Sequence, residues 1–312
     1  MLISVLINNY NYGHFLIEAV NSVLSQTYTK WELIIVDDGS TDDSHSIIKA
    51  IAEKDPRIRA VIQENGGQAA AFNAGVKNAT GEVMTFLDAD DLYKPDYLQK
   101  IYEVYSAIPE CDFLYTGLEK FGLEEEVVYP FNMTELTDLG FSNLLVLARE
   151  ISIGEPTSVM SIRAKAAHQI FPLPFVSDWK ISADNALCLA SSLALHRKFC
   201  LPEPLMRYRI HGGNHYAGVH QSSDRVYKDR MIRERLKAEY YDRFKYGNKP
   251  PIGRTWADQF VDEAATGNKP YAMLRRYAGV FNDPKVRLQQ PNLNLFKRWK
   301  YKKQIKTIMG KI

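Results

Sequence analysis

Residues 81–91 read GEVMTFLDADD, a short apolar run that ends in three carboxylates. The apolar part, Val83 to Leu87, is typical of a buried β-strand. Asp88 and Asp90 lie one residue apart at its end and can turn towards one hard cation, because Mg²⁺ and Mn²⁺ prefer oxygen ligands. Taken alone, however, the acidic run favours a turn that caps the following helix. The rest of the chain decides between these two interpretations.

Three more strands are predicted before this stretch, with amphipathic helices between them. The strands are expected at 2–7, 31–36 and 58–62, and the helices at 15–24, 47–51, 67–76 and 97–105. Such β-α alternation predicts an α/β fold, with a mostly parallel sheet and helices on both of its faces. Ligands of such open sheets bind outside the carboxyl ends of the strands.

Each of these strands ends in a polar cluster, namely Asn8-Asn9-Tyr10, Asp37-Asp38, Glu64-Asn65 and Asp88-Ala89-Asp90. Because parallel strands end at the same edge of a sheet, the four clusters should converge on one rim. This convergence reverses the interpretation of the acidic run and predicts a ligand site. Two adjacent acids at 37 and 38 exceed what capping requires, so one of them can accept hydrogen bonds from a nucleobase or ribose. Tyr10 either stacks on that base or packs within its loop.

The pattern is less regular after residue 110. Strands are predicted at 113–116, 158–162 and 205–210, and helices at 136–147 and 181–195. A segment rich in Gly, His and Ser at 212–223 precedes a run of charged helices, which places a boundary near residue 220.

Charge and cysteine content exclude several classes of protein. The net charge of +2 gives no global argument for a nucleic-acid partner. Cys111, Cys188 and Cys200 form no CxxC pair, so neither a zinc site nor a redox site is expected. No signal peptide and no run of about 18 apolar residues is found, which predicts a cytoplasmic protein with reduced thiols.

Four ordered motifs carry a resemblance to a known family. VLINNYNYGHFLIEAVNSVLSQTY (5–28), WELIIVDDGSTDDS (31–44), ENGGQAAAFNAG (64–75) and GEVMTFLDADD (81–91) resemble successive motifs of the inverting family 2 glycosyltransferases, which have the GT-A fold. The resemblance covers about residues 3 to 115. It implies metal-dependent transfer of one sugar from a nucleotide-diphosphosugar to a hydroxyl acceptor in surface polysaccharide, glycolipid or glycoprotein assembly. Among the possible donors it favours UDP-sugars.

The resemblance also implies roles for individual residues. In the first half, Asn8 and Tyr10 would hold the nucleobase and Asp38 would contact its edge. Asn65 and Gly67 would open the helix that faces the nucleotide. Asp88 would contact the ribose, and Asp90 would bind a Mn²⁺ or Mg²⁺ ion on the diphosphate. Asp91 is expected to be structural. Residues 1–115 would then form a nucleotide-binding half and 116–220 an acceptor half of one domain, followed by a helical region at 221–312.

The second half carries two further matching segments. SDWKISADNAL (177–187) resembles the segment with the catalytic base, and by register Asp184 is that base, with Asp178 as the other candidate. LPEPLMRYRIHGGN (201–214) is the second segment, in which Arg209 and His211 would meet the diphosphate or its metal. Absence of a QxxRW segment and of membrane spans favours transfer of single sugars over processive synthesis.

The last residues, 296–312, contain seven Lys and Arg residues and no acid, with Trp299, Ile305, Ile308 and Met309 interleaved. A basic amphipathic helix suits the anionic inner face of the cell membrane, where a lipid-linked acceptor would lie, although a solvated terminal helix is the alternative.

The helices after residue 220 could form a homo-oligomer interface. Two other functions fit the sequence less well, a sugar nucleotidyltransferase and a non-catalytic nucleotide-sugar-binding scaffold.

Overall fold

The computed structural model describes residues 1–130, 133–142, 146, 156–213 and 223–244. Ten strands of this part form one sheet: β1 (Ile3–Asn9), β2 (Trp31–Asp37), β3 (Ile58–Ile62), β4 (Val83–Asp88), β5 (Leu92–Tyr93), β6 (Phe113–Gly122), β7 (Glu126–Val128), β8 (Thr137–Gly140), β9 (Met160–Arg163) and β10 (Lys198–Ile210). Their order is β3-β2-β1-β4-β9-β6-β10-β5, with β7 beside β6 and β8 beside β10.

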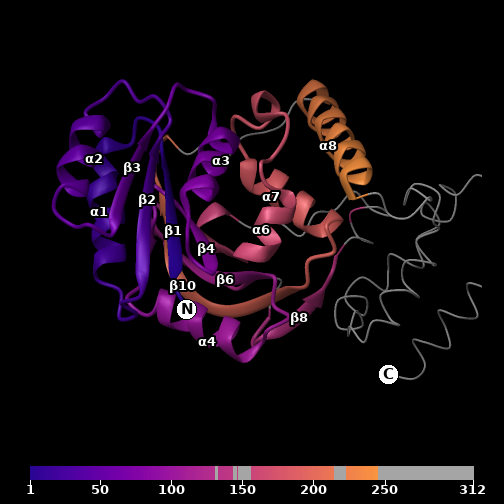
Figure 1. Cartoon of the computed structure of the whole chain (residues 1–312), viewed down its shortest axis with the longest axis horizontal. Coiled ribbons are helices and arrows are strands. Elements are labelled where there is room, and N and C mark those ends of the chain that lie inside the picture. Colours follow the sequence, from indigo (N-terminus) through magenta and orange to yellow (C-terminus); the bar gives the residue numbers. More distant parts are fainter. Residues whose placement is uncertain (131–132, 143–145, 147–155, 214–222, 245–312) are drawn as a thin grey trace, which may run out of the picture.

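The first four strands in this order are parallel throughout, as the sequence predicts. They are connected by the helices α1 (Gly13–Leu24), α2 (Ser44–Ala52) and α3 (Gln68–Asn78). Figure 1 shows α1 and α2 on one face of the sheet and α3 on the other. The apolar residues of β1 and β2 are buried between these layers, because strands covered on both faces by helices are apolar along their whole length. The predicted α/β fold, with helices on both faces of the sheet, is confirmed.

Beyond β4 the sheet becomes mixed. β9 is antiparallel to both β4 and β6, whereas β6 and β10 are parallel to each other. The strands predicted at 113–116 and 205–210 form parts of β6 and β10, which are both longer than expected. β10 shifts its register twice between Leu201 and Met206, where two prolines interrupt its regular pattern. The 3-10 helix η2 (Thr157–Val159) precedes β9 and takes the first residues of the strand predicted at 158–162.

The prediction of a helix at 136–147 is wrong for residues 137–140, which form β8 and pair antiparallel with β10. Asp138 accepts a hydrogen bond from the Arg197 guanidinium at 2.6 Å, which holds this strand on its neighbour. Gly140 and Ser142 have φ angles of 66° and 57°, and this left-handed backbone cannot continue a right-handed helix. Pairing with β10 therefore outweighs the helical spacing of the leucines in this segment.

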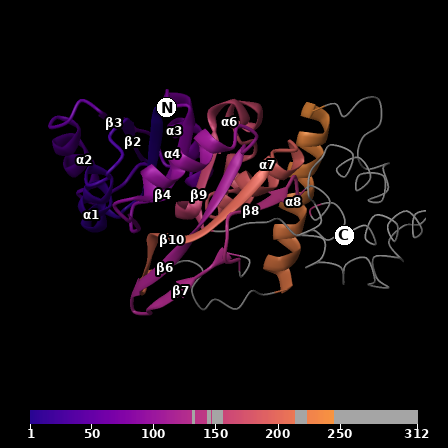
Figure 2. The ribbon, with the colours of Figure 1, turned by 90° about the horizontal axis from the view of Figure 1, so that it is seen from below.

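The remaining helices are α4 (Tyr97–Ala107), α6 (Ala164–Ile170), the 3-10 helix η3 (Val176–Asp178), α7 (Ala183–Leu193) and α8 (Ser223–Phe244). α8 lies after the predicted boundary at 220 and packs on α7, as Figure 2 shows from below. Leu236 and Tyr240 are fully buried there, and the Tyr240 hydroxyl donates to the Ile170 carbonyl at 2.6 Å. In the described part no helix is long and apolar enough to cross a membrane. The basic segment 296–312 lies outside the described residues.

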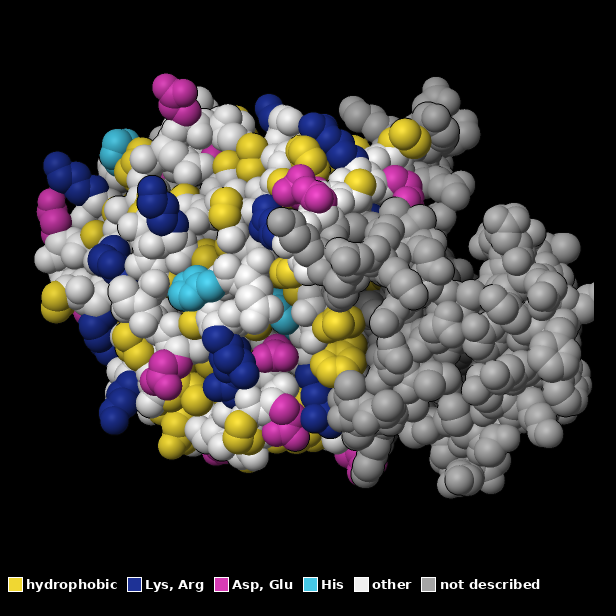
Figure 3. All heavy atoms as spheres, turned by 45° about the vertical axis from the view of Figure 1, so that its right-hand side comes forward, with side chains coloured by type: hydrophobic (Ala, Val, Ile, Leu, Met, Phe, Trp, Pro, Cys, Tyr) yellow, Lys and Arg dark blue, Asp and Glu magenta, His cyan; other side chains and the backbone are white. Residues whose placement is uncertain are grey.

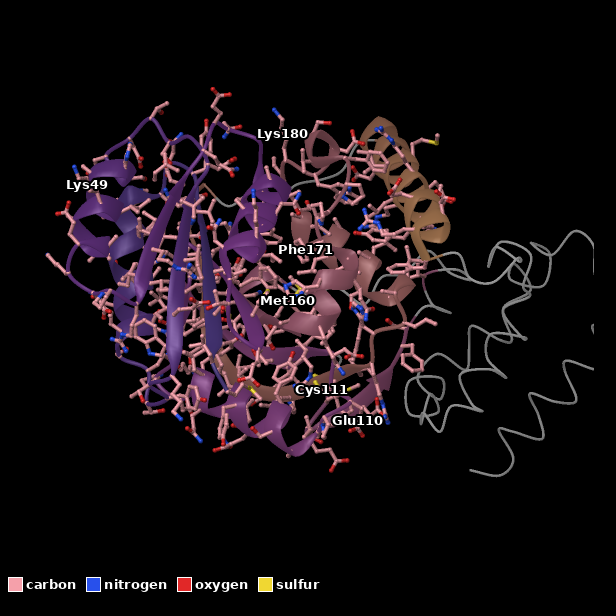
Figure 4. The ribbon with its side chains drawn as sticks, in the orientation of Figure 1. Lys49, Glu110, Cys111, Met160, Phe171 and Lys180 are labelled. Carbon is pink, nitrogen blue, oxygen red and sulfur yellow. The ribbon has the colours of Figure 1, made fainter. Side chains whose placement is uncertain are left out.

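The cysteines lie in the interior, and the charged side chains are spread over the surface. Cys111, Cys188 and Cys200 are buried, and no disulfide joins any two of them. Figure 4 shows Cys111 and Glu110 towards the lower end of the molecule, Met160 and Phe171 in its middle, and Lys180 at the upper end, towards which β1 to β4 run. On the face drawn in Figure 3, cationic and anionic side chains of the described residues are interspersed and form no single-sign patch.

Candidate active site

A cleft of about 600 Å³ opens at the carboxyl ends of β1, β2 and β4, a size typical of small-ligand sites. Eight of the ten predicted site residues line it: Asn8, Tyr10, Asp38, Asn65, Gly67, Asp88, Asp90 and Asp184. Its other lining residues are Asn9, Asn11, Tyr12, Gln68, Ala71, Ala89, Pro156, Thr157, Lys180, Ile181, Ser182 and Tyr208. Both halves of the chain therefore contribute to one cavity at the rim that the strand order predicts.

Tyr10 and Asp38 lie at the β1–β2 side of this cleft. Tyr10 is 47% exposed, so one face of its ring is accessible to a planar ligand. The Asp38 carboxylate is buried and accepts hydrogen bonds from the Gln63 amide at 2.6 Å and from the backbone N–H groups of Gly66 and Gly67 at 3.0 and 2.7 Å. Asp38 thus fixes the loop after β3 in addition to facing the cleft.

Asn65 and Gly67 belong to that loop. The Asn65 amide donates to the Asp38 carbonyl at 3.0 Å. Gly67 has a φ of +88°, and a Cβ atom there would lie 2.4 Å from Cα of Lys180. Only glycine allows both this backbone conformation and this close approach of the two halves of the chain.

Asp88, Asp90 and Asp91, called the acidic triplet below, lie at the end of β4 and directly after it. Asp88 accepts hydrogen bonds from the Asn8 amide at 2.8 Å and from the Gln68 amide at 3.2 Å. Asp91 is buried and accepts from the Ser158 hydroxyl at 2.6 Å and from the Arg209 backbone N–H at 2.9 Å. These contacts hold η2 and β10 against the triplet, which is a structural role for Asp91.

Crowding of these acids perturbs their proton affinity. Burial and the neighbouring charge of Asp90 raise the pKa of Asp88 to about 7, and the same two causes raise the pKa of Asp91 well above its usual range. One carboxylate oxygen from each of the three acids lies within 4.8 Å of the others. A divalent cation would neutralise this excess of negative charge, so the residues present fit a hard metal ion. The buried Oδ1 of Asn8, which has no hydrogen-bond partner among the described residues, is a further oxygen at this place.

Asp184 reaches the cleft from the second half of the chain, in the first turn of α7. Burial raises the pKa of its carboxyl group to about 6, against the opposing effect of hydrogen bonds from Asn185. The other candidate base, Asp178, lies in η3, does not line the cleft, and pairs with Arg235 at 2.9 Å. Of the two aspartates, Asp184 is therefore the one placed to meet a ligand.

Arg209 and His211 lie beside the triplet rather than among the residues that line the cleft. The Arg209 guanidinium donates to the Asp90 carbonyl at 2.8 Å and to the Glu18 carboxylate at 2.8 Å, and it stacks on Phe15. His211 Nε2 is 3.0 Å from Oδ2 of Asp90. Arg209 thus fixes the backbone of the triplet, and His211 contacts the carboxylate that is predicted to bind the metal.

Several polar residues of the cleft wall were not predicted from the sequence, among them Tyr12, Gln68, Thr157 and Tyr208. Gln68 falls inside the third motif and follows Gly67, so its place at a helix start beside the rim was a usable signal. Tyr208 lies between Arg207 and Arg209 in a predicted strand, which puts it on the opposite face from both. No local signal marks Thr157, because only the placement of η2 before β9 brings it to the cleft.

The fold and the cleft together define a class of protein. The α/β sheet with the Asp88-x-Asp90 pair at the end of β4 matches the GT-A glycosyltransferase fold. The sequence pattern of Glycosyl transferase family 2 matches residues 4–166. An uncharacterised glycosyltransferase of Nostoc sp. is 34% identical over 259 residues, which are 81% of this chain and 80% of the relative. The chain belongs to glycosyl transferase family 2 and is a glycosyltransferase.

Other relatives match over shorter regions. The glycosyltransferase GlyG of Streptococcus pneumoniae is 46% identical over 103 residues, 33% of this chain and 34% of that protein. A Bacillus subtilis protein named "Putative teichuronic acid biosynthesis glycosyltransferase TuaG" is 40% identical over 117 residues, 37% of this chain and 46% of its own length. The crystal structure of S. aureus TarS in complex with UDP-GlcNAc has a TM-score of 0.59 at 18% identity, covering 84% of this chain and 80% of that one, and shares the fold.

Proposed function

We propose that this glycosyltransferase moves a single sugar from a nucleotide-diphosphosugar to a hydroxyl group of an acceptor, with inversion at the anomeric carbon. The donor we propose is a UDP-sugar. The observation that carries the proposal is that Asp184 lines the same cleft as Asp88 and Asp90. A carboxylate that can accept a proton and a pair of carboxylates that can hold a diphosphate-bound cation thus face one ligand space.

The donor fits the β1–β4 side of the cleft. Tyr10 offers an accessible ring for stacking on the base, with Asn8 and Asp38 in the same cleft to contact that base, and Asp88 would accept a hydrogen bond from the ribose. Mn²⁺ or Mg²⁺ would be held by Asp90 with Asp88 and would stabilise the negative charge of the leaving diphosphate. Support for a uridine donor comes from the TarS structures with UDP-GlcNAc and with UDP, which share this fold.

The transfer itself is a direct displacement. The acceptor oxygen forms a bond to the anomeric carbon while the bond from that carbon to the diphosphate oxygen breaks, and the acceptor proton passes to the Asp184 carboxylate. With a pKa of about 6, this carboxylate is ionised at neutral pH and still basic enough to take the proton.

The acceptor is assigned to surface polysaccharide, glycolipid or glycoprotein assembly, and the name of the relative TuaG supports the first of these. We also place the protein in the cytoplasm, with the basic segment 296–312 on the inner face of the membrane; its charge and apolar pattern are the support.

A panel of nucleotide-sugars tests the proposal. With Mn²⁺ present, UDP-sugars should raise the melting temperature more than GDP- or dTDP-sugars do, because a ligand that binds the folded state stabilises it. NMR of the product formed from the best donor should show the opposite anomeric configuration to that donor. A retained configuration, or release of pyrophosphate instead of a nucleoside diphosphate, would contradict the proposed reaction.

A further inference from the structure

Gln68, the first residue of α3, joins three segments that are far apart in the sequence. Its amide nitrogen donates to Oδ1 of Asp88 at 3.2 Å and to the Thr157 hydroxyl at 3.1 Å. Its amide oxygen accepts from the backbone N–H of Ala183 at 2.9 Å. One side chain thus connects the end of β4, the start of η2 and the start of α7. Figure 1 shows α7 beside α3.

The backbone beside Gln68 strengthens the same connection. The N–H groups of Gln68 and Ala69 donate to the carbonyls of Lys180 and Trp179 at 3.0 and 3.2 Å. The first N–H groups of a helix are free to bind an anion unless another group takes them. Here these two hold the 179–183 segment of the acceptor half, and Gly67 allows that segment to come so close.

The position of Asp184 depends on this contact. Ala183, whose N–H is held by Gln68, is the first residue of α7 and directly precedes Asp184. Asp88, held by the other end of the same amide, lies on the donor side of the cleft. A planar amide with both ends engaged fixes how far apart these two carboxylates lie, and a displacement of about 1 Å can lower a reaction rate about 100-fold.

We propose that Gln68 is a positioning residue for glycosyl transfer, coupling the Asp88 carboxylate to the first turn of α7 so that Asp184 keeps its place relative to the donor. This inference rests on the proposed function. Gln68 acts through Asp88 and Asp184 and does not itself touch the reacting atoms. Its removal should therefore lower the rate of transfer more than the affinity for the nucleotide.

Gln68→Met tests the proposal, because methionine keeps the length of the side chain and removes all three hydrogen bonds. The matched control is Asn73→Ala on the same helix, where the amide exchanges two hydrogen bonds with the backbone of Leu173 at 3.0 and 2.7 Å, away from the cleft lining. Gln68→Met should lower kcat at least about tenfold with the Kd for UDP changed less than about threefold. It should also raise donor hydrolysis relative to transfer. Asn73→Ala should lower the melting temperature but leave kcat within about twofold.

A second variant separates the two ends of the amide. Gln68→Glu keeps an acceptor for the Ala183 N–H but cannot donate to Asp88 and places a like charge beside it, so kcat should fall as in Gln68→Met. Wild-type kcat in Gln68→Glu, or equal kcat losses in Gln68→Met and Asn73→Ala at equal melting temperature, would overturn the positioning role. If the wild-type protein transfers no sugar from any nucleotide-sugar, the proposed function fails instead.

Discussion

Replacing Asp184 with Asn should make the protein more stable at neutral and alkaline pH. Burial in the cleft wall raises the pKa of this carboxyl group from 3.8 to about 6. The folded chain therefore binds the proton more tightly than the unfolded chain, and stability falls as pH rises from about 4 to about 6. A shift of about two units corresponds to about 3 kcal/mol at pH above 6. Asparagine has no charge to bury and keeps an oxygen for the Asn185 N–H, which now lies 2.7 Å from Asp184.

Urea unfolding of wild type and Asp184→Asn, without added metal or nucleotide, measures this difference at pH 4.5 and pH 8. The variant should be more stable by about 2–3 kcal/mol at pH 8 and by much less at pH 4.5. Asp178→Asn is the control, because Asp178 forms a partly exposed pair with Arg235 and its loss costs about 0–1 kcal/mol. Equal stability of wild type and Asp184→Asn at pH 8 would refute the claim that this carboxylate is held in a desolvated place.

Three further substitutions test other parts of the structure. Gly67→Ala should lower the free energy of unfolding by about 2 kcal/mol or more, because the backbone φ there is +88° and the new methyl group would meet Lys180. Gly212→Ala, with no atom of the described residues within 4 Å of its Cβ position, should melt like wild type. Asp90→Ala should fold and still bind UDP weakly, but Mn²⁺ should no longer raise its melting temperature in the presence of UDP; an unchanged Mn²⁺ effect would remove Asp90 from the metal site. Tyr240→Phe should cost about 1 kcal/mol and speed proteolysis near α8, because the Ile170 carbonyl then keeps only one of its two donors, the Arg243 guanidinium at 2.9 Å. An unchanged cleavage rate would show that α8 is held by other contacts.

The first half of the fold could be predicted because its signals are local. β1, β2 and β4 are each a short, mostly apolar run bounded by polar residues, and each connecting helix has apolar residues at helical spacing. Parallel pairing then follows from β-α alternation, and the rim at the strand ends follows from parallel pairing. The order of these strands and helices is therefore enough to bring Asn8, Asp38 and Asp88 into one site.

The second half depends on contacts that the local pattern does not show. Pro202 and Pro204 hid the first part of β10, and the segment of β8 was misinterpreted because only its partner makes it a strand. Arg209 was expected at the diphosphate or its metal from the segment in which it lies, and its ion pair with Glu18 of α1 could not be predicted. Such long-range ion pairs carry no signature within either segment.

Transfer by Asp184→Asn measured beside donor binding tests the central claim most directly. With a UDP-sugar and Mn²⁺, the variant should bind the donor with a Kd within about threefold of wild type while kcat for transfer falls about 10²–10⁴-fold, the usual contribution of a general base. Asp178→Asn, measured in parallel, should keep kcat close to wild type because its carboxylate lies outside the cleft lining. Full transfer activity in Asp184→Asn would contradict the assignment of Asp184 as the base.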